Sequence, residues 1–123
     1  MTIDSADTSS PTITRIARIT ALLLTLVLFT LGNLPAAGQA FPGILHWVAH
    51  FSAYALIAFT FSLGWPHRPA VYLGLLVAAI GVLHETTEII THHHTFETED
   101  VMVNALAALL GIAVHRLFRH PVQ

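Results

Sequence analysis

The chain has 123 residues, of which 54% are hydrophobic and only 10% are charged, whereas soluble domains carry about 25% charged residues. So large an apolar excess cannot be buried in the small core of a soluble chain of this length, and it indicates a single membrane domain. A net charge of -2 and the absence of cysteine disfavour nucleic-acid binding and exclude disulfides, thiolate metal ligands and cysteine nucleophiles.

The chain begins with a polar stretch, residues 1–14, which is rich in Ser, Thr and Asp and predicts a flexible tail. A mainly apolar segment follows at residues 16–34, long enough for a helix to cross about 28 Å of hydrocarbon. A cleaved signal sequence is the alternative for this segment, with Arg15 and Arg18 as its basic start and Ala36-Ala37-Gly38 as the cleavage site. An intact amino terminus on the mature protein would exclude that alternative.

Three further apolar segments have the length of transmembrane helices, at residues 44–65, 70–90 and 101–118. The prolines of Pro66-His67-Arg68-Pro69 end the second helix and predict a tight turn into the third. We therefore predict an all-α fold, an integral membrane four-helix bundle over residues 15–120. The competing interpretation, a soluble helical bundle, would require polar helical faces that these segments nearly lack.

The basic residues predict how this bundle lies in the membrane. They all fall at one end of the predicted helices, at Arg15, Arg18, Arg68, Arg116 and Arg119. Because cytoplasmic segments carry the excess of Lys and Arg, we expect both chain ends in the cytoplasm. The segments at the opposite end, residues 35–43 and 91–100, would then lie outside an inner or plasma membrane that the chain crosses four times.

Polar side chains on three helices are expected to meet near the outer leaflet. They are His46, His50 and Tyr54 on the second helix, His84, Glu85 and Glu88 on the third, and Asp100 and Asn104 on the fourth. The spacing of four residues puts the members of the second and fourth helices on one face of each. Ionisable groups cost about 2.5 to 3.5 kcal/mol each at mid-bilayer on insertion scales, and they usually face a protein interior or water. Contact with one another would satisfy them.

Two neighbouring carboxylates, Glu85 and Glu88, carry the strongest chemical signal. Such carboxylates lose their protons at different pH values, because the charge of one opposes ionisation of the other. This difference prepares them for general acid and base catalysis or for cation binding. The predicted catalytic residues are His50, Glu85 and Glu88, and the predicted ligand-binding residues are Tyr54, His84, Asp100 and Asn104. The alternative is a packing role, in which these groups only hydrogen-bond the helices together and Asp100 also caps the fourth helix.

Histidine and carboxylate together also suit zinc or another divalent ion. The sequence His84-Glu85-Thr86-Thr87-Glu88 matches the HExxH zinc-protease helix only in part, because Glu88 replaces the second histidine. The run His92-His93-His94 is otherwise typical of a solvated loop. We therefore expect no bound cofactor, and if a divalent metal does bind, its candidate ligands are His46, His84, His92 and His94.

The order and spacing of the polar residues resemble those of the VanZ-like family of small bacterial membrane proteins. The resemblance covers residues 46–111, through His50-Phe51 with Tyr54, Glu85 with Glu88, and Asp100 with Asn104 followed by Gly111. The chain departs from the family pattern where His46-Trp47 replaces a frequent Asp-Lys, Glu88 replaces Gln, His94 replaces a frequent Arg and Ala107 replaces Gly. These departures make the site more acidic and leave histidine as its local cation.

The resemblance implies work at the cell envelope, without a settled reaction that could be transferred. We expect an outer-leaflet pocket that binds or modifies a membrane lipid, a lipid-linked ligand or a small polar ligand. The alternative is a non-enzymatic membrane module that organises partner proteins, or forms a homo-oligomer, through the small residues Ala107 and Gly111. Ion-coupled transport is less favoured, because four helices leave little room for two gates unless the chain oligomerises.

Overall fold

The structure, a computed structural model, describes residues 10–119 and contains no strand over that range. Its elements are α1 (Pro11–Gly32), α2 (Ala37–Ala40), α3 (Ile44–Gly64), α4 (Ala70–His92) and α5 (Thr98–Arg119). Each of the four long helices is long and apolar enough to cross a membrane. The predicted fold class, an all-α chain with four membrane-length helices, is therefore confirmed.

Several helix boundaries differ from those expected. α1 begins at Pro11, so residues 11–14 are helical and do not belong to a tail, while residues 1–9 lie outside the described residues. Proline suits a first helical turn because its missing N–H would have no partner inside the helix. α5 begins at Thr98, with two carboxylates in its first turn, where they interact favourably with the helix dipole. α4 continues to His92 and ends at His93, whose φ of 58° is left-handed.

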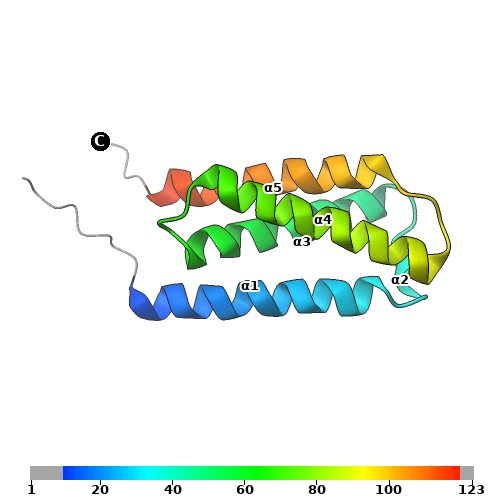
Figure 1. Cartoon of the computed structure of the whole chain (residues 1–123), viewed down its shortest axis with the longest axis horizontal. Coiled ribbons are helices and arrows are strands. Elements are labelled where there is room, and N and C mark those ends of the chain that lie inside the picture. Colours follow the sequence, from blue (N-terminus) through cyan, green and yellow to red (C-terminus); the bar gives the residue numbers. More distant parts are fainter. Residues whose placement is uncertain (1–9, 120–123) are drawn as a thin grey trace, which may run out of the picture.

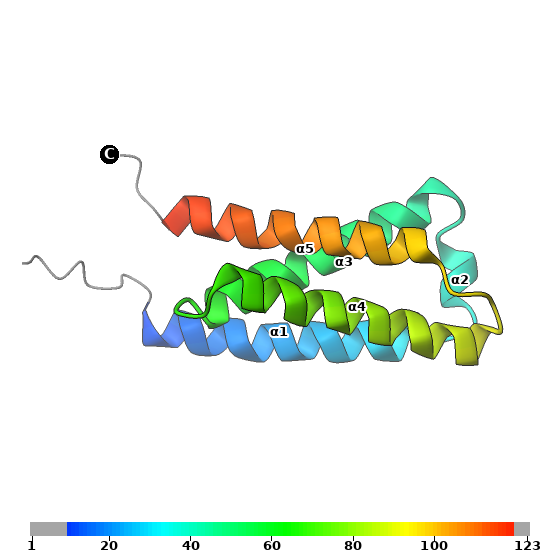
Figure 2. The same cartoon turned by 45° about the horizontal axis from the view of Figure 1, so that its top comes forward.

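The four long helices lie side by side, with α1 at the edge of the bundle (Figure 1). α3 packs along α5 and α1, and α4 packs mainly against α5. Figure 2 shows that the start of α1, the α3–α4 turn and the end of α5 share one end of the bundle, whereas α2 and the α4–α5 loop share the other. α3 and α5 consequently run parallel, both starting at the α2 end.

Large apolar side chains cover the outside of the bundle, including Leu26 on α1, Leu75 on α4 and Leu109 on α5. The interior combines small residues such as Ala21, Ala58 and Ala107 with larger ones such as Tyr54 and Leu73. In a bilayer the exposed apolar surface contacts lipid, and small interior residues let the helix backbones approach closely. The large apolar side chains on the outside agree with a membrane bundle.

Arginine side chains close the end of the bundle at which α1 begins. The guanidinium group of Arg18 donates from Nε to the Gly64 carbonyl over 2.7 Å. Arg116 donates to the carbonyls of Pro66 and Arg68 over 3.1 and 2.6 Å. These bonds satisfy carbonyl groups at the end of α3 and in the following turn, which lack a helical partner. We call this end, with its five arginines, the basic end.

α3 and α5 lie in close contact at Gly111. A Cβ atom added to Gly111 would collide with the Ala55 carbonyl and lie 3.0 Å from the backbone nitrogen of Phe59. Gly111 and Ala107 are both buried. Their small size therefore serves the packing of α5 against α3 within one chain, and not a surface open to a partner protein.

We predict that Gly111→Ala destabilises the bundle by about 1–3 kcal/mol, because the added methyl group overpacks the contact with α3. Gly74→Ala is the matched control, since its Cβ would meet only Ile112 Cδ1 at 3.8 Å. That control should leave stability unchanged or raise it by up to about 1 kcal/mol through helix propensity. Unfolding of both variants by denaturant titration in detergent measures the difference, and equal stabilities would contradict the tight contact.

Candidate functional site

The second end of the bundle collects the polar side chains that the sequence singled out. It is formed by α2, the start of α3, the end of α4, the α4–α5 loop and the start of α5, and we call it the polar end. The side chains it brings together are His46, His50, Tyr54, His84, Glu85, Glu88, Asp100 and Asn104. Seven of the eight are buried, and His46 is half-buried.

Three aromatic rings on α3 form a continuous row into the bundle. The ring centroids of His46 and His50 are 4.5 Å apart, and those of His50 and Tyr54 are 6.2 Å apart. The ring of His84 on α4 closes the inner part of the row, at 6.2 Å from His50 and 6.4 Å from Tyr54. The row thus runs from an accessible histidine to a fully buried tyrosine.

Two hydrogen bonds join this row to α5. His46 Nε2 and Asp100 Oδ2 are 2.8 Å apart, and His50 Nδ1 and Asn104 Oδ1 are 3.1 Å apart. Because an amide oxygen can only accept, His50 carries its proton on Nδ1, and its lone pair lies on Nε2. Both pairs join residues 54 positions apart, as expected for two parallel helices with side chains repeating every four residues.

The two carboxylates of α4 have different surroundings. Glu85 is fully buried, and its Oε1 accepts the backbone N–H of Glu97 over 2.8 Å, which holds the α4–α5 loop against α4. Glu88 lies one turn further on, with Oε2 at 3.8 Å from His84 Nδ1, and borders the cavity described below. Glu88 is therefore the carboxylate that a ligand could reach, and Glu85 supports the loop.

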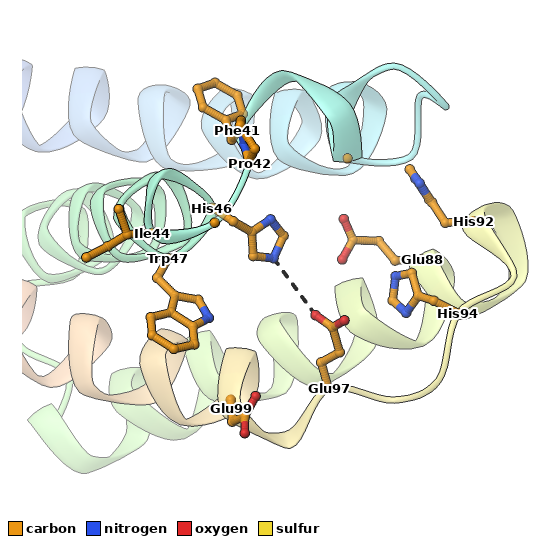
Figure 3. A pocket seen from close by; sticks show the side chains of 12 residues that line it. Phe41, Pro42, Ile44, His46, Trp47, Glu88, His92, His94, Glu97 and Glu99 are labelled. Carbon is orange, nitrogen blue, oxygen red and sulfur yellow. Dashed lines mark ion pairs between the residues drawn. The ribbon is translucent and has the colours of Figure 1, made fainter.

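Glu97 joins the site from the α4–α5 loop, although the sequence offered no reason to choose it. Its Oε2 lies 4.0 Å from His46 Nε2, the contact drawn as a dashed line in Figure 3. The hydrogen bond between the side chains of Glu97 and Asp100 raises the pKa of Glu97. In the same loop, the Thr95 carbonyl that accepts from the His94 ring raises the pKa of His94. The loop thus presents one carboxyl and one imidazole that both retain protons more readily than usual.

One possible metal site exists among residues 10–119. His46, His50 and Asp100 each offer a ligand atom, and these atoms lie within 4.8 Å of one another. Of the four predicted metal histidines, only His46 belongs to this group. His92 instead donates to the Gly32 carbonyl over 3.0 Å, His94 donates to Thr95, and His84 lies beside Glu88.

A cavity of about 590 Å³, which we call the chamber, opens at the polar end. Its polar wall consists of His46, Glu88, His92, His94, Glu97 and Glu99, and its apolar wall includes Phe41, Ile44 and Trp47. Figure 3 shows the side chains of α3, α4 and the α4–α5 loop facing one another across this space. The short helix α2, which the sequence did not predict, supplies Gly38 to the wall.

A narrower space, the α1–α3 groove, adjoins the chamber. Its first part, of about 170 Å³, shares His46 and Glu88 with the chamber and reaches His50 and His84. Its second part, of about 230 Å³, lies between α1 and α3 and has an apolar lining that includes Leu28, Ala53 and Ile57. Chamber and groove together place a polar space beside an apolar one.

We compared the chain with protein-family models, with curated proteins and with solved structures, and none matches it.

Proposed function

We propose that the protein is a VanZ-like cell-envelope protein that binds a membrane lipid or a lipid-linked molecule. The polar headgroup would occupy the chamber, and the hydrocarbon chain would occupy the α1–α3 groove. The observation that carries this proposal is the adjacency of the two spaces, since His46 and Glu88 border both. A small polar ligand without a chain would use the chamber but would leave the apolar groove without a role.

The size and walls of the chamber agree with a ligand site. Ligand pockets commonly measure about 300–1,000 Å³ and combine apolar walls with a few polar groups that fix the orientation of the ligand. The chamber falls within this range and has both kinds of wall. An amphiphile fits better than a wholly polar solute, because the groove beside the chamber has an apolar lining. The groove is bordered by α1, whose exposed leucines would face lipid in a membrane.

The orientation that we propose puts the chamber on the extracytoplasmic side. All five arginines lie at the basic end, where they bind the α3–α4 turn or lie near the start of α1 and the end of α5. By the positive-inside rule this end faces the cytoplasm, together with Pro11 and Arg119, the ends of the outermost helices. The ligand would then come from the outer leaflet of an inner or plasma membrane.

If the ligand is modified as well as bound, the site contains groups for proton transfer. Glu88 would act as base or proton carrier, because it borders the chamber. His50 would be its imidazole partner, and Asn104 would orient His50 through their hydrogen bond. Tyr54 and His84 would line the inner end of the site, and Glu85 would hold the loop that carries Glu97.

A second candidate function, a membrane module that organises partner proteins, is favoured by a different surface. An apolar groove of about 560 Å³ runs between α4 and α5 on the outside of the bundle and is lined by small residues such as Gly74, Ala78 and Ala113. Small residues of this kind support helix association in membranes. This function needs neither the chamber nor its carboxylates, so mutations at the polar end distinguish the two candidates.

Blocking the α1–α3 groove should release bound lipid. Ala53 borders both parts of the groove, so Ala53→Phe would fill the space for a chain. We expect about tenfold less co-purified lipid per chain than in the wild type, equivalent to about 1.4 kcal/mol of binding free energy. Native mass spectrometry of the protein in mild detergent measures this ratio. Ala79→Phe, on an exposed face of α4, is the matched control, and equal lipid loss in both variants would contradict the groove.

Neutralising Glu88 should abolish function without loss of protein. In a strain deleted for the gene, we expect Glu88→Gln to fail to restore the wild-type envelope phenotype at normal abundance, checked by immunoblot. Loss of a general base slows a reaction by about 10²–10⁴-fold, so a catalytic Glu88 predicts complete failure. A partial defect would indicate that Glu88 contributes to binding instead. Full rescue by Glu88→Gln would instead favour the membrane module, in which polar groups only pack the helices.

The proposed orientation predicts which positions are accessible from outside the cell. Because the chain has no cysteine, single cysteines report their location without background. Thr95→Cys, in the α4–α5 loop, should react with a membrane-impermeant maleimide in intact cells, whereas Thr12→Cys should react only after lysis. Both side chains are exposed, so burial does not explain a difference, and the reverse labelling pattern would overturn the orientation.

A further inference from the structure

We propose that His46, His50 and Asp100 bind one divalent transition-metal ion, best suited to Zn²⁺, at the junction of the chamber and the α1–α3 groove. This inference does not depend on lipid binding, because metal binding can be measured with the ion alone. It would add a Lewis-acidic centre beside His46, which borders both the chamber and the groove.

The first argument is the convergence of ligand atoms. One side-chain atom from each of the three residues lies within 4.8 Å of the others, close enough for small rotations to bring them to zinc distances of about 2.0–2.2 Å. The histidines stand one turn apart on α3, and Asp100 stands in the first turn of α5, so two packed helices hold the set. Three protein ligands with a free position are typical of catalytic zinc sites.

The second argument is the charge of the polar end. All five acidic residues among residues 10–119 lie there: Glu85, Glu88, Glu97, Glu99 and Asp100. The chain has no lysine, and its five arginines all lie at the basic end. Asp100 is almost fully buried, and a buried carboxylate requires a hydrogen-bonded cationic partner. A divalent cation at this position would neutralise charge that histidine alone must balance.

The third argument is that hydrogen bonds to other residues hold the ligand side chains in place. Metal-binding histidines usually donate their second ring nitrogen to an oxygen acceptor, which fixes the tautomer. His50 does so, because Asn104 Oδ1 accepts from its Nδ1 and leaves the Nε2 lone pair for an ion. His46 Nε2 faces Asp100 at 2.8 Å and Glu97 at 4.0 Å. On binding, the ion would replace the proton between His46 and Asp100, which would pass to water, while Glu97 lies beside this group and does not belong to it.

The ligand set also selects the kind of ion. Two imidazoles with one carboxylate suit Zn²⁺, and also Fe²⁺ or Mn²⁺, whereas Cu⁺ prefers sulfur and Ca²⁺ and Mg²⁺ prefer oxygen ligands only. Among these, Zn²⁺ is bound most readily because it accepts four-coordinate sites without a geometric preference. If the proposed lipid function holds, the open position could take an oxygen of the headgroup, such as a phosphate oxygen.

Direct titration of purified protein with Zn²⁺ tests the site. The full-length chain, with any affinity tag removed, is stripped with a chelator and titrated by calorimetry, and bound metal is counted by elemental analysis. We expect the wild type to bind about one Zn²⁺ per chain. Asp100→Asn, which keeps the size of the side chain, and His50→Ala should each lose this binding. Asn104→Ala should weaken it by about 10–100-fold, as expected when a supporting hydrogen bond is removed.

His93→Asn serves as the matched control. It removes an exposed histidine from the neighbouring loop and retains a residue that tolerates the left-handed φ of 58°. This control should bind Zn²⁺ like the wild type, and circular dichroism of every variant verifies its helical content. If His50→Ala does not fold, Asp100→Asn and the ligand-field absorption of bound Co²⁺ still report on the site. Absence of binding to the wild type, or equal binding by wild type and Asp100→Asn, would overturn the proposal.

Discussion

The close parallel contact between α3 and α5 at Gly111 is the constraint on which the polar end depends. It fixes how far one helix is shifted along the other, and that shift decides which side chains meet. Nearly the same offset recurs along the interface: it is 54 residues in His46 with Asp100 and in His50 with Asn104, and 53 residues in Ser62 with His115. A bulkier residue at Gly111 would separate the backbones, so the hydrogen bonds nearer the chamber would lengthen although no member of the site had changed.

The separation of charge along the bundle is the second organising feature. Arginines at the basic end donate to backbone carbonyls of the α3–α4 turn, whereas all carboxylates of the described helices lie at the polar end. A bilayer between the two ends would prevent either set from reaching the other. The carboxylates are therefore restricted to histidine, to backbone N–H groups, to one another and to ligands from outside the chain.

Much of this arrangement was predictable from helix periodicity, because the face on which a residue lies is determined within its own helix. The apolar lengths and the prolines near residue 66 determined four helices, and the spacing of four residues determined the faces of His46, His50, Asp100 and Asn104. Partners across helices were not predictable, since they depend on the offset of α3 and α5. For the same reason the sequence did not indicate that Glu97 belongs to the site, or that Ser62 lies 2.7 Å from His115. α2, with four residues, is too short for a periodic signal.

A purely structural role fits some of these groups better than others. Asn104 and Glu85 have inward-facing partners, as helix-packing groups should. His46, Glu88 and Glu97 instead border an open chamber, where each retains an unoccupied side toward the cavity. Helix packing would be served more cheaply by apolar residues at these positions, because every ionisable group near the membrane carries a free-energy cost. These three side chains therefore lie where a molecule entering the chamber would meet them.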